Sequence, residues 1–219
     1  MTAAYRERQT DRILQAAEEC FARNGFQATS MDEVIAAAGM SSSTVYRYFP
    51  EGKRSLIRAV LTRRMGPLVE RIKRIAESEE PLDFERDFIE ALTLLNYQRH
   101  GAAAGSEADR QDDAHEAPGD VGLSSWAPLA YHAWGELTRD PEMSVLVQEG
   151  YRDIHGGLIR LCRNGQRMGT ISCRLSPDQL ASLIQSVSFG LVVEQLITGR
   201  ADVESAAATL RQLLAPEGA

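Results

Sequence analysis

The sequence has few of the features that indicate a secreted, membrane-spanning or disulfide-stabilised protein. Its 219 residues include only 3 cysteines. Cys20, Cys162 and Cys173 are odd in number and widely separated, which favours a reduced, cytoplasmic protein over a disulfide scaffold. No uninterrupted run of about 18 apolar residues occurs, so we expect no membrane helix. The N-terminal residues turn polar at once, so we also expect no signal peptide.

Motifs typical of enzymes and metal sites are missing as well. His100, His115, His132 and His155 show no H-x-x-x-H spacing, and no CxxC pair accompanies them. We therefore expect no metal and no cofactor. There is no nucleophile elbow, no phosphate-binding loop and no pair of carboxylates in a convincing context, so we do not expect an enzyme.

Charge is distributed unevenly along the chain. The protein as a whole is acidic, with 24 Lys and Arg against 31 Asp and Glu. Residues 1–76, however, contain 13 basic and 8 acidic residues, whereas the remainder contains 11 and 23. The N-terminal part can therefore approach phosphates, and the acidic remainder cannot.

Apolar residues recur at spacings of three and four along most of the chain, without β-type alternation, so we expect an all-α fold. The expected helices span residues 10–24, 31–38, 42–49, 53–76, 84–95, 123–137, 141–163, 177–198 and 203–214. Residues 101–122 are rich in Gly, Ala and acid and predict a mobile loop. Residues 177–198 are apolar nearly all round, which favours one side buried and another facing a partner subunit. We expect a head of residues 1–54 and a body of residues 55–219.

Two short helices within residues 30–50 form the most informative pattern. Ser30 and Glu33 make a capping box, Gly39 ends the first helix and Ser41 caps the second. Two short helices joined by so tight a turn predict a helix-turn-helix, whose second helix enters the major groove of DNA.

The second helix of this pair has two chemically distinct sides. Val45 and Phe49, four residues apart, can face the core. The opposite side presents hydroxyl, guanidinium and phenol groups, which bond to phosphates and base edges: Ser43, Thr44, Arg47 and Tyr48. Lys53 starts the next helix, where a phosphate is also favoured.

The same stretch resembles the DNA-binding domain of the tetracycline-repressor (TetR/AcrR) family. The resemblance spans about 50 residues and is carried by Ile13–Ala17, Phe21–Phe26, Thr29–Met31, Ala38–Ser41, Tyr46–Pro50, Lys53 and Leu56. Beyond about residue 76 it extends only to helix order and length. The resemblance implies a dimeric, ligand-responsive transcriptional regulator, usually a repressor.

The resemblance also implies residue roles. Thr29 and Ser30 match the phosphate-contacting start of the second helix, and Ser42, Ser43 and Thr44 match base-proximal residues. Tyr46 and Tyr48 match an aromatic pair on the phosphate backbone, and Lys53 matches a phosphate-binding lysine. The sequence departs from the family at Ile35, where a small residue is usual, and at Pro50-Glu51-Gly52, which places Lys53 one residue later than usual.

Each role has a structural alternative. Tyr46 can be a core aromatic, while Tyr48 is expected to be exposed because it follows Thr44 by four residues. Arg47 can be a solvated charge, and Ser42 and Ser43 can be simple polar surface.

In the body, aromatic and polar residues at helical spacing are candidate effector contacts, with plain core as the alternative. They are Phe88, Asn96, Trp126, Tyr131, Trp134, Tyr151, His155, Gln185 and Phe189. Glu194, set among apolar residues, requires a partner or exposure to solvent.

The sequence therefore predicts a ligand-responsive DNA-binding regulator, typically a repressor released from a palindromic operator by a small molecule. Its partners would be double-stranded DNA, a small-molecule effector and a second copy of the chain, with no membrane. Two alternatives stay open: an all-helical enzyme or carrier with a vestigial head, and a thiol redox sensor that uses Cys162 and Cys173.

Overall fold

A computed structural model describes residues 3–96 and 123–216, and all regular structure within these ranges is helical. The described chain divides into two compact units, one ending at Arg63 and the other beginning at Arg64. The loop predicted for residues 101–122 lies outside the described residues.

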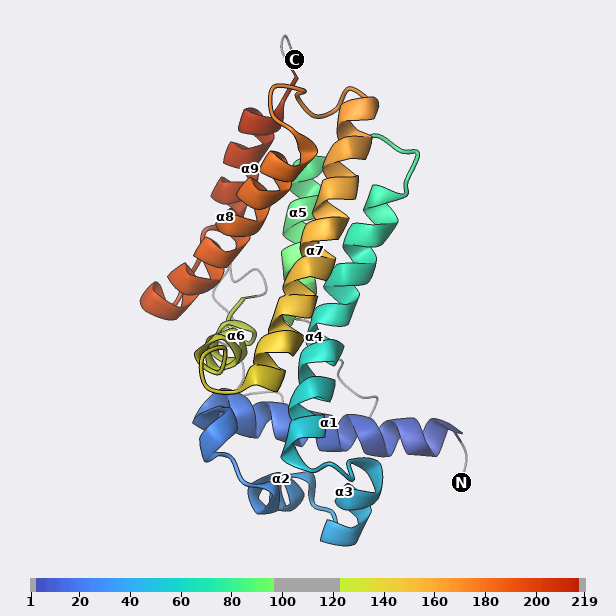
Figure 1. Ribbon diagram of the computed structural model, residues 1–219, viewed down its shortest axis with the longest axis vertical. Helices are drawn as coiled ribbons and strands as arrows, with labels where there is room; N and C mark the ends of the chain where they lie inside the picture. Colours follow the sequence, from blue (N-terminus) through green and yellow to red (C-terminus); the bar gives the residue numbers. More distant parts are fainter. Residues whose placement is uncertain (1–2, 97–122, 217–219) are drawn as a thin grey trace, which may run out of the picture. The chain divides into compact units, whose positions relative to one another are not determined.

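The first unit contains three helices and the beginning of a fourth. These are α1 (Ala3–Ala28), α2 (Met31–Ala38), α3 (Ser42–Tyr48) and the first part of α4 (Lys53–Ala76) (Figure 1). The first helix starts earlier than predicted. Its helical course is broken at Gly25, where φ is 81° and ψ is 167°. Only glycine adopts that conformation readily, so Gly25 redirects the chain toward α2.

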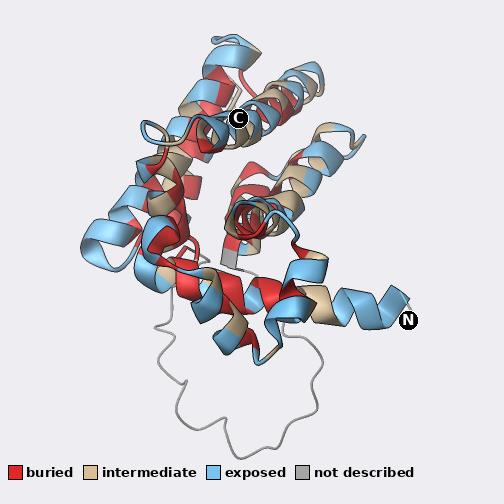
Figure 2. Ribbon diagram, turned by 60° about the horizontal axis from the view of Figure 1, so that its bottom comes forward, coloured by how far each residue is buried: buried red, intermediate tan, exposed pale blue. Residues whose placement is uncertain are grey.

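The core of this unit forms around that bend. The rings of Phe21 and Phe26 meet edge to face, with centroids 5.2 Å apart. Each of the three helices contributes a fully buried side chain to this core: Ile13 from α1, Val34 from α2 and Val45 from α3. Figure 2 shows that α1 is exposed over its first turns and becomes buried further along. The three helices therefore share a single apolar core.

The second unit holds the rest of α4 and the remaining helices. These are α5 (Phe84–Thr93), the 3-10 helix η1 (Leu94–Asn96), α6 (Ala127–Gly135), α7 (Pro141–Arg167), α8 (Pro177–Thr198) and α9 (Val203–Leu214). α8 packs on α7 and α6, and α9 packs on α5. The prediction for 123–137 was too long, because residues 124–126 form a turn before α6.

The predicted helix caps are confirmed. Ser30 and Glu33 form a complete capping box, Ser41 caps α3, and Gly39 ends α2 at φ 60°. The backbone N–H and the hydroxyl of Ser30 both donate to the Glu33 carboxylate, and these bonds lower the pKa of Glu33 below its usual value. A carboxylate at this helix start also complements the helix dipole.

Within the second unit, α4 and α7 approach each other closely at Gly157. A Cβ atom at this position would lie 2.7 Å from Cγ2 of Ile72. Glycine is therefore required at this position by packing, not by backbone conformation. Nearby, Arg71 of α4 also donates to the Asp87 carboxylate of α5 at 2.7 Å.

By length and composition alone, α8 could cross a membrane, with a mean hydropathy of 1.6 over an 18-residue window. This was not expected from the sequence. One such helix is weak evidence for a membrane span, because core helices of soluble proteins meet the same criteria; 39% of the window is buried within the protein.

Substituting Gly157 by Ala should destabilise the protein by about 1–3 kcal/mol, because the new methyl group overpacks the contact with Ile72. Gly150→Ala is the matched control in the same helix, since a Cβ there meets nothing within 4 Å. It should stabilise the protein by about 1 kcal/mol, through helix propensity. Urea unfolding followed by circular dichroism measures both changes, and equal effects would contradict the close approach.

Glu33→Gln should lower the melting temperature at neutral pH, because it keeps the capping acceptor but removes the charge. Since folding lowers the pKa of Glu33, the stabilisation is full above the usual pKa and is lost as the pH falls through the lowered value. The difference between native and variant melting temperatures should therefore close in acid. The uncharged box of Ser176 and Gln179 provides the control: the cost of Gln179→Ala should show no comparable pH dependence.

Candidate nucleic-acid interface

The helix α3 presents one apolar and one polar side, as its sequence predicts. Val45 is fully buried and Phe49, directly after the helix, is also buried. Ser42, Ser43, Tyr46 and Arg47 are exposed. The exposed side therefore offers hydroxyl, phenol and guanidinium groups, the donors and acceptors that read base edges and phosphates.

The cap of α3 restrains part of this polar side. The Oγ atom of Ser41 accepts from the backbone N–H of Thr44 and lies 2.8 Å from the hydroxyl of Thr44 and 3.2 Å from that of Ser43. The hydroxyls of Ser43 and Thr44 thus belong to a local hydrogen-bond network. Arg47, a turn further along, projects the only charge that α3 carries.

The two tyrosines of α3 differ in exposure, and only Tyr48 departs from its expected position. Tyr46 is 42% exposed, so the alternative that it is a core aromatic is wrong. Tyr48 is half-buried, and its hydroxyl oxygen is enclosed without a hydrogen-bond partner among the described residues. The Arg47 guanidinium lies 5.7 Å from the centroid of the Tyr48 ring. The expectation that Tyr48 is exposed is therefore corrected, and its ring supports Arg47 instead.

Thr29 also requires correction. Its side chain is completely buried, and its hydroxyl lies within bonding distance of the carbonyl oxygens of Cys20 and Gly25. The bend at Gly25 turns this side chain inward, so its hydroxyl does not face a phosphate. Ser30 is exposed, but its hydroxyl and N–H both bond to Glu33.

Two basic side chains near this surface bind backbone oxygens. The ammonium group of Lys53 donates to the carbonyls of Gln27 and Thr29, which the sequence did not indicate. Arg12 of α1, which sequence reasoning missed, reaches the carbonyl of Gly39 at 3.4 Å. No spacing rule could reveal contacts between residues more than 20 positions apart.

In the second unit, five of the nine predicted effector contacts come together. The rings of Trp134 in α6 and Phe189 in α8 meet edge to face, with their centroids 5.3 Å apart. The ring of Tyr151 in α7 stacks with that of Phe189 and with that of His155, each at a centroid distance of 5.9 Å. We call these four residues the aromatic column. Gln185 adjoins it, because its Nε2 donates to the carbonyl of Tyr151 at 3.2 Å.

The amide of Gln185 determines which ring nitrogen of His155 carries the hydrogen in the neutral imidazole. Since Nε2 of Gln185 is the donor to the carbonyl of Tyr151, its Oε1 faces Nδ1 of His155 at 2.7 Å and accepts the hydrogen bond that the Nδ1–H donates. The other ring nitrogen, Nε2, lies 3.4 Å from the Asp178 carboxylate. The neutral imidazole therefore presents an acceptor there, and the protonated form an ion pair.

The other four predicted effector contacts are not members of the column. Phe88 is buried against Phe84 in α5, and Trp126 is buried at the start of α6. Tyr131 is 60% exposed, and the side chain of Asn96 lies outside the described residues. Glu194 is exposed, which meets the requirement placed on it by the sequence.

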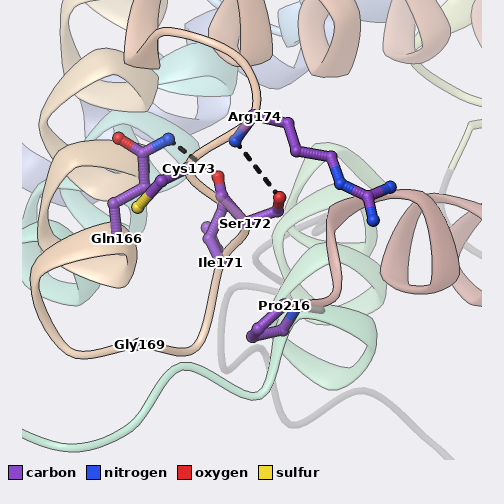
Figure 3. Close-up of a pocket in the computed structure, with 7 residues that line it drawn as sticks. All are labelled: Gln166, Gly169, Ile171, Ser172, Cys173, Arg174 and Pro216. Carbon is purple, nitrogen blue, oxygen red and sulfur yellow. Dashed lines mark hydrogen bonds between the residues drawn. The ribbon is translucent and has the colours of Figure 1, made fainter. Parts of the chain in front are cut away.

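A separate pocket of about 400 Å³ opens where the α7–α8 connection meets the chain after α9 (Figure 3). None of the predicted effector contacts lines it; its residues are Gln166, Gly169, Ile171, Ser172, Cys173, Arg174 and Pro216. Gln166 donates to the Ser172 carbonyl across one side of the pocket.

The cysteines give no support to a redox pair. All three are free thiols. Cys162 is buried, and burial raises the pKa of its thiol to about 12. Burial likewise raises the pKa of Cys20. Because the thiolate is the reactive form, only the exposed Cys173 is available for chemistry.

Comparisons with known proteins agree with this architecture. Residues 13–60 match the family model of bacterial regulatory proteins of the tetR family, and residues 117–217 match the C-terminal domain of BetI-type transcriptional repressors. The HTH-type transcriptional regulator UidR of Escherichia coli K12 is 22% identical over 84% of this chain and 79% of its own.

Solved structures show the same fold. Salmonella enterica GusR superposes with a TM-score of 0.68 at 23% identity, covering 94% of this chain and 92% of its own. A putative transcriptional regulator from Saccharomonospora viridis in complex with choline has a TM-score of 0.65 at 20% identity, with 94% and 95% covered. With a helix-turn-helix head that matches one family model and a helical body that matches another, the chain belongs to the tetR family of bacterial transcriptional regulators.

Proposed function

We propose that this regulator is a cytoplasmic homodimeric repressor that binds a palindromic operator and releases it when a small molecule occupies the body. The observation that carries the proposal is the division of α3. Its apolar side is buried in the head core, and its exposed side holds Ser42, Tyr46 and Arg47. Such a helix can enter a major groove without unfolding any part of the head.

The surface of α8 supports a dimer. Small and apolar residues at helical spacing line its exposed side: Ser182, Ser186, Gly190, Val193 and Ile197. Ile197 is 78% exposed, and Leu213 on α9 is 65% exposed. Small residues let two helices approach closely, and exposed large apolar residues favour burial against a partner. Two copies related by two-fold symmetry would require half-sites about one DNA turn apart, or slightly more.

The aromatic column is the region that we propose for the effector. It joins α6, α7 and α8, so a ligand bound there would shift three helices of the body at once. The Saccharomonospora viridis regulator, which has the same fold, is in complex with choline, which supports a body that accepts small molecules. A ligand regulates only if it binds the DNA-free arrangement better than the DNA-bound one.

Arg47→Ala should weaken operator binding by about 1–3 kcal/mol, or roughly 5- to 150-fold, and relax the preference at one base pair in each half-site. Selection from a random duplex pool with the native protein and the variant measures both effects. Arg74→Ala, an exposed arginine of the second unit, is the control and should select the native site. If the native protein enriches no sequence, the alternative of a vestigial head gains support.

Ile197→Glu should weaken the dimer by about 100-fold, because each copy would then bring a carboxylate into the proposed apolar contact. Sedimentation velocity at several concentrations measures the change. Tyr131→Glu places the same charge on α6, at another exposed apolar residue, and should leave the dimer intact. An unchanged dimer in the α8 variant would place the interface elsewhere.

A further inference from the structure

Lys53, the first residue of α4, is directed at the corner between α1 and α2, which comprises residues 25–30. Its Nζ atom lies 3.1 Å from the carbonyl oxygen of Gln27 and 3.1 Å from that of Thr29. The side chain is half-buried. Two of the three ammonium protons are therefore used by the head's own backbone.

The corner is a favourable place for such a donor. The last carbonyls of a helix have no partner within the helix, and a cation near them is favoured both by hydrogen bonding and by the helix dipole. The break at Gly25 separates Gln27 from the main course of α1. The Thr29 hydroxyl lies within bonding distance of the carbonyls of Cys20 and Gly25, and Lys53 donates to those of Gln27 and Thr29.

The turn before α4 determines where Lys53 points. Gly52 adopts a left-handed conformation, at φ 67°, immediately before the helix begins. Relative to the usual family pattern, the Pro50-Glu51-Gly52 turn places Lys53 one residue later. The turn therefore departs from the family pattern directly before α4, where the path of the chain determines the direction in which Lys53 leaves the helix start.

We propose that Lys53 is a positioning residue, which anchors the α1–α2 corner to the start of α4 and does not bind a DNA phosphate. The corner ends at Ser30, the cap of α2, so this anchor also fixes where α2 begins. The helix α4 begins at Lys53 in the first unit and ends at Ala76 in the second. A movement of α4 would therefore be transmitted to the corner through Lys53. The inference rests on the proposed DNA-binding function.

Lys53→Met tests the proposal because it keeps the length of the side chain and removes the ammonium. Arg74→Met is the control; it removes one positive charge from the same helix, about 30 Å away along the axis. The duplex is the site selected by the native protein. Two quantities are measured on the full chain: operator affinity between about 50 and 200 mM salt, and hydrogen exchange of the amides of residues 26–33 without DNA.

In Lys53→Met, the corner amides should exchange about tenfold faster and operator affinity should fall about tenfold. The slope of log affinity against log salt should equal that of the native protein, because no phosphate contact is lost. Lys53→Arg, which keeps a cationic donor, should restore most of the protection. Arg74→Met should change neither quantity.

Two results overturn the proposal. A salt slope that is less steep by about 0.9 in Lys53→Met would mean that a phosphate contact has been lost. Unchanged exchange at residues 26–33 would mean that Lys53 does not hold the corner. If the native protein selects no duplex, the proposed function fails separately, and the exchange measurement alone decides whether Lys53 is an anchor.

Discussion

The bend of α1 at Gly25, and the apolar core packed around it, determine what the head can present to DNA. Phe21 and Phe26 lie on either side of the bend, and their rings contact each other at its centre. Val34 and Val45 pack into the same core. Because each short helix contributes only a few buried residues, none would be stable alone. The orientation of α3, and hence of Arg47, depends on this shared burial.

The acidity of the whole protein does not oppose DNA binding, because its charges are segregated. Residues 1–76 carry an excess of basic groups, and the excess of acid lies in the rest of the chain. Within the first unit, several basic groups are nevertheless bound to protein oxygens: Lys53 to two carbonyls, Arg12 to Gly39 and Arg63 to Glu18. The net charge therefore overstates the number of basic side chains that are available to bind DNA phosphates.

The helix caps were predictable from the sequence because a few neighbouring residues determine each of them. The capping box of Ser30 and Glu33, the cap at Ser41 and the left-handed Gly39 all join residues no more than four apart. The bounds of α4, α8 and α9 followed from periodicity together with Gly and Pro signals.

Contacts between distant residues were not predictable in the same way. The inward Thr29 follows from the bend at Gly25, and the roles of Tyr46 and Tyr48 depend on how α3 packs. The sequence offered nine effector candidates but could not tell which of them meet. Tyr151 with Phe189 and His155 with Gln185 pair because α7 and α8 run antiparallel, and Phe88 lies on a different helix. In each case tertiary packing determined which side chains are buried and which are in contact.

The most direct test of DNA binding through α3 is hydrogen exchange of the full chain with and without the selected operator duplex. Operator binding should slow the exchange of amides in residues 41–49, where α3 and its cap would lie in the groove. Operator binding that leaves the exchange of these amides unchanged would contradict the assignment of α3 as the reading helix.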